Sequence, residues 1–191
     1  QGINVEGTPC VLLMQMPLPR SLQAEGAEDS FIRTLSQVQD DLRRDYVTGA
    51  YNAVYLNEQY RPIAERAAMS GTPVGVVMVR VNEYWQLREH ESDSAANCCL
   101  NMAAGILQLA VGPDHDKAVL ARLNDGFFAI VTIGTPAARM AQTVREAMND
   151  SRREFNISLS RRGSFTVEIA SAEWGETASW DMTLSLAQQR L

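Results

Sequence analysis

The sequence contains little cysteine, little histidine and no excess of positive charge, and each shortage excludes a class of protein. Three cysteines and two histidines among 191 residues give neither a disulfide framework nor a cluster at metal-ligand spacing. Cys98 and Cys99 are neighbours in a helical pattern, so we interpret them as small buried thiols of a reduced protein. A net charge of −6 leaves no basic stripe for phosphate groups, and no nucleic-acid partner is expected.

Long apolar runs are also missing. No stretch of about 18 apolar residues is present, which is the length that a membrane span requires, so we expect no membrane contact in this part of a chain. No basic segment followed by an apolar one opens the sequence as a signal peptide would. We therefore predict a cytoplasmic protein, or the cytoplasmic part of a longer chain.

The residues that are present predict a globular α/β (α+β) domain. Hydrophobic residues make up 46% of the chain, which is enough for a substantial core. An apolar run at 74–81 is typical of a strand covered on both faces, and helical patterns occupy 94–111, 136–150 and 176–190. Alternation at 155–159 and 165–169 predicts a hairpin around 161–163. Together these patterns predict a mixed, mainly antiparallel central sheet flanked by helices.

Another hairpin is predicted at residues 118–131. Two apolar runs flank a tight polar turn, and Asp-Gly between hydrophobic runs is the strongest short-range signal for a hairpin. We expect Gly126 to adopt the positive φ that such a turn needs, since glycine has no side chain to clash, and Asp125 tolerates it.

The first 46 residues are organised differently. Residues 8–16 predict a short strand that Pro17 and Pro19 stop. This strand is similar to the closing strand of a PAS-type sensor domain, so we interpret residues 1–19 as the end of an upstream sensor and 20–46 as a linker and signalling helix. The helix, expected from Ser30 to Tyr46, carries apolar residues spaced four, three and four apart: Phe31, Leu35, Val38 and Leu42. Two interpretations are open: the apolar stripe packs against the helix's own domain, or it pairs with the same helix of a second copy of the chain. The position of the helix between a sensor-like strand and an output domain favours the second, a homodimer through helix 30–46.

Two stretches carry a further resemblance. Residues 45–56, DYVTGAYNAVYL, are similar to the N-terminal motif of the GGDEF (diguanylate cyclase) family, Asp-x-Leu-Thr-Gly-Leu-Tyr-Asn-Arg-Arg-x-Leu, with Ala53 and Val54 in place of the paired arginines. The 118–131 hairpin resembles the family segment Ala-Arg-x-Gly-Gly-Asp/Glu-Glu-Phe, whose last five residues fall on 124–128. The resemblance covers about residues 40–191 and implies a GGDEF, nucleotidyl-cyclase-like fold over 47–191.

The chemistry that the resemblance implies lacks its side chains here. Family members join nucleoside triphosphates with two divalent ions, and Mg²⁺ requires carboxylate ligands. In a gap-free overlay, Arg80 replaces a metal-binding Asp, Gly126 replaces the acidic ligand in the turn, and Phe127 replaces the catalytic Glu. Because a fixed cation repels Mg²⁺, we expect no catalytic residue, no metal site and no cofactor, with Mg²⁺ and GTP bound only if the remnant site functions.

Other positions of the family's site also differ. Arg88 and Asn97 replace two guanine-reading residues, and we expect Asn97 to cap the start of a helix. The family's feedback site for cyclic di-GMP falls on residues 115–118, which lack its Arg and Asp. Two interpretations of Arg80 stay open: its guanidinium holds a phosphate, or it pairs with Asp125 or Glu83, which we favour.

We therefore predict a degenerate GGDEF domain in a multidomain bacterial signalling protein. It would act without catalysis, through dimerisation and relay from an upstream sensor domain in the same chain. The alternatives are a receptor for GTP or cyclic di-GMP that uses the remnant pocket, and a residual diguanylate cyclase. The remnant pocket comprises Arg80, Asn82, Arg88, Asn97, Asn124, Asp125, Gly126 and Phe127.

Overall fold

The computed structural model describes residues 2–5, 8–11, 27–114, 117–158 and 165–191. The chain divides into two compact units, Gln1–Asp40 and Asp41–Leu191. In the first unit, strand β1 (Gly2–Val5) pairs antiparallel with β2 (Thr8–Val11), and helix α1 (Ala27–Leu42) begins. The strand predicted at 8–16 is thus present up to Val11, and its remaining residues, with Pro17 and Pro19, lie outside the described residues.

Helix α1 is displaced from its predicted bounds, because it begins at Ala27 instead of Ser30 and ends at Leu42 instead of Tyr46. Asn52 accounts for the early end. Its side-chain Nδ2 donates to the carbonyl of Leu42, and its backbone N–H donates to the carbonyl of Arg43, both at 2.8 Å. Carbonyls at the helix end therefore find partners outside the helix, and the chain turns away.

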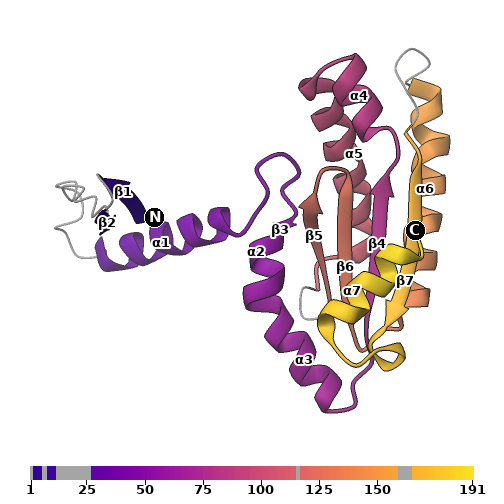
Figure 1. Ribbon diagram of the computed structural model, residues 1–191. Coiled ribbons are helices and arrows are strands. Elements are labelled where there is room, and N and C mark those ends of the chain that lie inside the picture. Colours follow the sequence, from indigo (N-terminus) through magenta and orange to yellow (C-terminus); the bar gives the residue numbers. More distant parts are fainter. Residues whose placement is uncertain (1, 6–7, 12–26, 115–116, 159–164) are drawn as a thin grey trace. The chain divides into compact units, whose positions relative to one another are not determined.

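A five-stranded sheet forms the centre of the second unit, in the order β3-β5-β6-β4-β7 (Figure 1). The predicted hairpin is present as β5 (Ala118–Asn124) and β6 (Phe127–Ile133), and β4 (Val74–Val81) pairs antiparallel with β6. At one edge β7 (Val167–Glu173) pairs antiparallel with β4, and at the other the two-residue β3 (Tyr51–Asn52) pairs parallel with β5. The mixed, mainly antiparallel sheet is confirmed.

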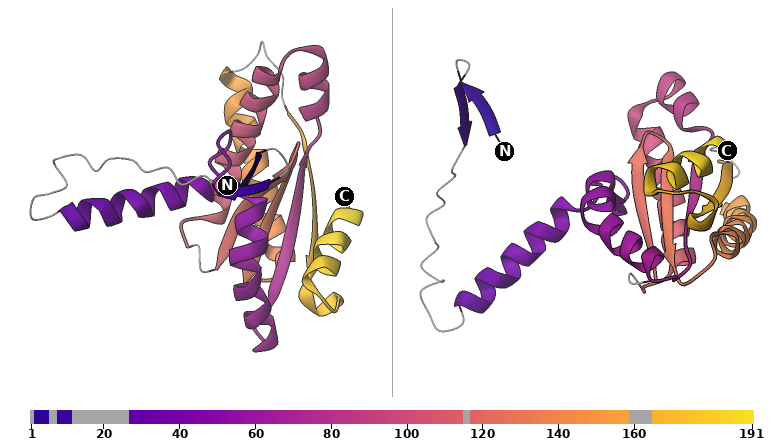
Figure 2. Two further views of the ribbon diagram at one scale, coloured as in Figure 1. Left: turned by 60° about the vertical axis from the view of Figure 1, so that its left-hand side comes forward. Right: turned by 60° about the horizontal axis from the view of Figure 1, so that its bottom comes forward.

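Helices cover both faces of this sheet (Figures 1 and 2). One face packs against α5 (Asp93–Val111) and α6 (Ala137–Ser158). The other face packs against the segment of α2 (Ala53–Tyr55), a π-helical turn (Leu56–Tyr60) and α3 (Arg61–Met69), and against α7 (Trp180–Gln189). Two shorter elements, α4 (Tyr84–His90) and a 3₁₀ turn (Trp174–Glu176), follow β4 and β7.

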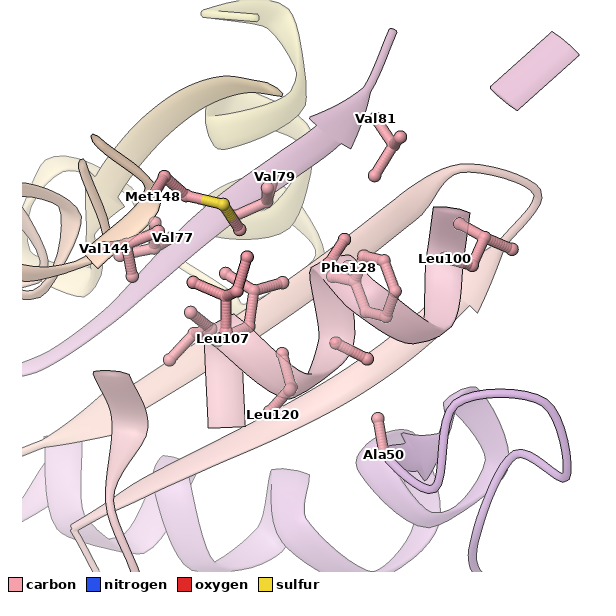
Figure 3. Close-up of a cluster of buried hydrophobic side chains, with 14 of the residues drawn as sticks. Ala50, Val77, Val79, Val81, Leu100, Leu107, Leu120, Phe128, Val144 and Met148 are labelled. Carbon is pink, nitrogen blue, oxygen red and sulfur yellow. The ribbon is translucent and has the colours of Figure 1, made fainter. Parts of the chain in front are cut away.

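The alternation of β4 and β6 divides their side chains between two cores. Val77, Val79 and Phe128 belong to the core under α5 and α6, which also holds Leu107 and Met148 (Figure 3). The neighbouring residues of the same strands enter the core under α3 and α7. Because both faces are covered, the strands are apolar throughout, as the unbroken run at 74–81 indicates.

Helix α5 is a core helix. Among the described residues it is the helix long and apolar enough to cross a membrane by length and composition, and here its apolar side faces the sheet. Cys99 is buried on that side but Cys98 is exposed, so the expectation of two buried thiols is wrong for Cys98. Successive helical residues point about 100° apart, which separates the two thiols.

The second predicted hairpin does not form. Residues 155–158 continue α6, which ends at Ser158, and residues 159–164 lie outside the described residues. The predicted strand at 165–169 is present in part as β7, but its partner is β4. Five alternating residues fit a helix or a strand equally well, and the partner of β7 is set by register with β4, a strand distant in sequence.

Candidate remnant site at the β5–β6 turn

The turn between β5 and β6 has an unexpected backbone. Asp125 has a positive φ, 39°, and Gly126 does not, so the expectation that Gly126 supplies the left-handed residue is wrong. Glycine is required for another reason, because a Cβ at Gly126 would lie 3.0 Å from Tyr84 Cβ and 3.0 Å from the Val81 carbonyl oxygen. The turn is therefore pressed against the start of α4, and no side chain fits at Gly126 unless a neighbour moves.

Arg80 lies on β4, opposite Phe127 of β6 and Glu168 of β7. Its Nη2 donates to the Glu168 carboxylate, and its Nε donates to Asn82 Oδ1 at 3.4 Å. The favoured interpretation, that Arg80 pairs with a carboxylate, is confirmed, but the predicted partners Asp125 and Glu83 are wrong. The register of β4 and β7 places Glu168 directly across from Arg80, which the sequence alone does not reveal.

Glu83 is held elsewhere. Its two carboxylate oxygens accept hydrogen bonds from the backbone N–H and the hydroxyl of Thr166, both at 2.7 Å. Asn82 Nδ2 donates to the same hydroxyl oxygen at 3.1 Å. Glu168 and Thr166 thus complete a polar network across the ends of β4 and β7. Sequence reasoning missed both residues, and the only signal for them was a charged residue inside an alternating strand pattern.

Arg88 of α4 links that helix to the turn. Its Nε donates to Asp93 at 3.0 Å, its Nη1 lies 3.9 Å from an Asp125 carboxylate oxygen, and its guanidinium lies 5.5 Å from the ring centre of Trp85. Two carboxylates therefore offset its charge. The Trp85 side chain next to it is 53% exposed.

Two other predicted residues have structural roles that differ from expectation. Asn97 is the fifth residue of α5 and does not cap it; Ser92 does, by accepting the backbone N–H of Ala95 at 3.1 Å. Phe127, opposite Asn124 across the turn, packs its ring against the core under α3 and α7. The position to which the resemblance assigns a catalytic Glu thus holds a partly buried aromatic ring.

The fold brings most of the predicted remnant pocket together. The Val81 N–H donates to the Gly126 carbonyl at 2.8 Å, which joins the end of β4, with Arg80 and Asn82, to the turn. Arg88 reaches the same turn through Asp125. A pocket of about 370 Å³ between turn 44–51 and the end of α5 includes none of these residues.

The residues at this site do not fit a pair of magnesium ions. Among the described residues, no group of three Asp, Glu, His or Cys side chains is arranged to hold a metal. Glu168 pairs with Arg80, Glu83 accepts from Thr166, and Asp125 lies beside Arg88. Each nearby carboxylate is already engaged, and the guanidinium of Arg80 lies at the position to which the resemblance assigns a metal-binding Asp.

Comparison with known proteins identifies the architecture. The family model described as "Diguanylate cyclase, GGDEF domain" matches residues 42–191. Three solved structures illustrate the likeness. The coiled coil and GGDEF domain of DgcB from Caulobacter crescentus, in complex with c-di-GMP, is 18% identical with a TM-score of 0.72, over 89% of each chain. The GGDEF domain of FimX from Pseudomonas aeruginosa is 21% identical with a TM-score of 0.61, over 78% of this chain and 90% of that one. Diguanylate cyclase SiaD from Pseudomonas aeruginosa, in complex with its activator SiaC, is 20% identical with a TM-score of 0.64, over 90% of this chain and 66% of that one.

Proposed function

Since the chain belongs to the GGDEF domain family of diguanylate cyclases, we propose that it is a catalytically inactive member. It relays a signal from an upstream sensor domain by dimerisation, in the cytoplasmic part of a multidomain bacterial protein. The observation that carries the proposal is the ion pair between Arg80 and Glu168 at the place where the family's chemistry requires a metal-binding carboxylate.

The charge at this site opposes the reaction. When a ribose hydroxyl attacks an α-phosphorus, negative charge develops, and divalent ions stabilise it in this family. Arg80 supplies one positive charge, but Glu168 already offsets it, and neither group can take the place of two ions held by carboxylates.

The shape of the turn opposes the reaction as well. An acidic side chain such as the family carries at Gly126 would crowd its neighbours, because its Cβ would lie 3.0 Å from Tyr84 Cβ and 3.0 Å from the Val81 carbonyl oxygen. The Phe127 ring can neither bind a metal nor accept a proton. These two positions support inactivity independently of the charge at Arg80.

Incubation with GTP and Mg²⁺ or Mn²⁺, followed by chromatography of the products, tests the proposal. We expect no cyclic di-GMP at any protein concentration, beside a parallel reaction with a GGDEF protein whose acids are intact. Cyclic di-GMP that increases with protein concentration would overturn the proposal.

Relay is supported by the exposed stripe of α1. The side chains of Phe31, Leu35, Val38 and Leu42 are between 44% and 74% exposed. Apolar side chains at this spacing bury themselves most readily against a second helix, and two copies of the chain provide it. A homodimer through α1 would hold two GGDEF domains under the control of their sensors.

A second candidate, a nucleotide receptor, is favoured by one observation. Trp85 presents an exposed ring beside the Arg88 guanidinium, a pair on which a base can stack. Calorimetry with GTP, GDP and cyclic di-GMP, with and without Mg²⁺, tests it against a Trp85→Ala variant. Heat that the variant loses would support a receptor, and no heat up to millimolar nucleotide would exclude it.

A further inference from the structure

The two edges of the central sheet are protected in different ways. An edge strand presents unpaired backbone N–H and C=O groups that can pair with a strand of another chain. At one edge, β3 is only two residues long and offers little to pair with. At the other edge, β7 runs for seven residues from Val167 to Glu173, long enough for a stable ladder.

The register shows which residues of β7 face outward. The Asn82 N–H donates to the Thr166 carbonyl at 3.1 Å, so the even-numbered residues at this end of β7 bond to β4. Hydrogen-bonding direction alternates along an antiparallel strand. Ile169, Ser171 and Glu173 therefore direct their backbone groups toward the free edge.

Side chains bond to three of these outward groups. Arg145 of α6 donates to the Ile169 carbonyl at 3.2 Å, and Arg190, which follows α7, donates to the Ser171 carbonyl at 2.7 Å. The Glu173 N–H donates to Glu176 at 2.8 Å. The two arginines reach the edge of β7 from helices on opposite faces of the sheet, so the edge is covered from both faces.

Arg190 is itself held in place. Its guanidinium pairs with Glu176, with Nη1 at 3.0 Å from one carboxylate oxygen and Nη2 on the other. A bidentate pair fixes the plane of a guanidinium. The Nη1 atom that donates to Ser171 is therefore directed at the strand edge.

We propose that Arg145 and Arg190 prevent the β7 edge from pairing with another strand, and that without them β7 pairs with the β7 strand of a second copy of the chain. Antiparallel pairing of a strand with itself is two-fold symmetric and needs only the same edge on both partners. The guanidinium groups on the Ile169 and Ser171 carbonyls block the N–H groups of an incoming strand at these two positions and place positive charge where two copies would meet. The inference does not depend on the proposed function.

Sedimentation velocity of the full chain tests the proposal over a range of concentrations. The double variant Arg145→Ala with Arg190→Ala should form assemblies of at least twice the mass of the wild-type species at the highest concentration. Hydrogen exchange of segment 167–173 should slow as they form. A control variant, Arg66→Ala with Arg139→Ala, removes the same charge from exposed positions on α3 and α6 and should sediment like the wild type.

A third substitution identifies the edge as the contact. Ser171→Pro removes an outward N–H without breaking a bond to β4, which a strand edge tolerates. Added to the double variant, it should restore the wild-type mass. The single variant Arg145→Ala breaks none of the ion pairs among the described residues and should associate more weakly than the double variant. It therefore tests the proposal even if the double variant unfolds. The proposal is wrong if neither Arg145 variant associates, or if association persists with Ser171→Pro.

Discussion

Arg122 of β5 and Asp45, in the turn after α1, form the least exposed ion pair described in the second unit: Arg122 Nη1 lies 3.0 Å and 3.1 Å from the two carboxylate oxygens. The same guanidinium donates through Nη2 to the Asp125 carbonyl at 3.3 Å. Arg122 therefore joins the turn after α1 to the β5–β6 turn.

We expect Asp45→Asn to lower the free energy of unfolding by about 2 kcal/mol, because it leaves a largely buried guanidinium without its counter-ion. Urea unfolding of Asp45→Asn, Arg122→Ala and the double variant would measure the coupling. If the decreases in unfolding free energy of the two single variants simply add up to that of the double variant, the Asp45–Arg122 pair contributes nothing to stability.

The same pair predicts a dependence on pH. Burial alone would raise the pKa of Asp45, but hydrogen bonds from Thr48 and Arg122 outweigh it and hold the pKa below its ordinary value of 3.8. A carboxyl with a lowered pKa stabilises the fold above its ordinary pKa, and that stability is lost as pH falls through the folded value. The wild type should lose more stability than Asp45→Asn between about pH 5 and pH 2.

Gly126→Ala should destabilise the protein by about 1–3 kcal/mol, since the new Cβ overpacks against Tyr84 and the Val81 carbonyl. Gly105→Ala is the matched control, because Gly105 lies within α5 with open space around its Cβ position. That substitution should stabilise by up to about 1 kcal/mol. Equal melting temperatures for the two variants would contradict the close approach at the turn.

The Arg80–Glu168 pair should contribute little to stability, because both side chains are 40% exposed and water screens them. A double-mutant cycle to Ala should give a coupling of about 1 kcal/mol or less, decreasing as salt is added. The exchanged variant Arg80→Glu with Glu168→Arg should fold like the wild type. A coupling well above this range would mean that the pair is a structural requirement of the fold.

Leu35→Glu with Val38→Glu should abolish the proposed homodimer, because a charge in the apolar stripe of α1 cannot be buried against its twin. Gln37→Glu introduces one such charge on another face of the helix and serves as the control. Equilibrium sedimentation would distinguish them. Dimers that survive the first change would show that α1 does not hold the copies together.

Alkylation should distinguish the adjacent cysteines. Burial, with smaller contributions from Glu83 and Cys98, raises the pKa of the Cys99 thiol to about 12, so at pH 8 it has almost no reactive thiolate. In a Cys10→Ser background, iodoacetamide should modify the exposed Cys98 and leave Cys99 intact until the protein unfolds. Peptide mass spectrometry would show the order, and simultaneous modification would contradict the burial of Cys99.

Local patterns predicted the elements that depend on neighbouring residues. The apolar run at 74–81, the helix near 94–111 and the Asp125–Gly126 hairpin are each defined by residues close in sequence, and all three are present. Residues 155–158 were predicted wrongly, because five alternating residues do not distinguish strand from helix. The outer strand β7 was recognised in part but not its partner.

The sequence by itself determined the fold class, the family and the absence of an acid at positions 80, 126 and 127, because each is carried by residue types at fixed spacing. The tertiary structure alone decided what surrounds these three positions. Glu168 meets Arg80 from 88 residues away, and Tyr84 lies close beside Gly126. Strand register and the packing of a helix against a turn set these contacts, and both result from burying the two cores as a whole, which no local pattern encodes.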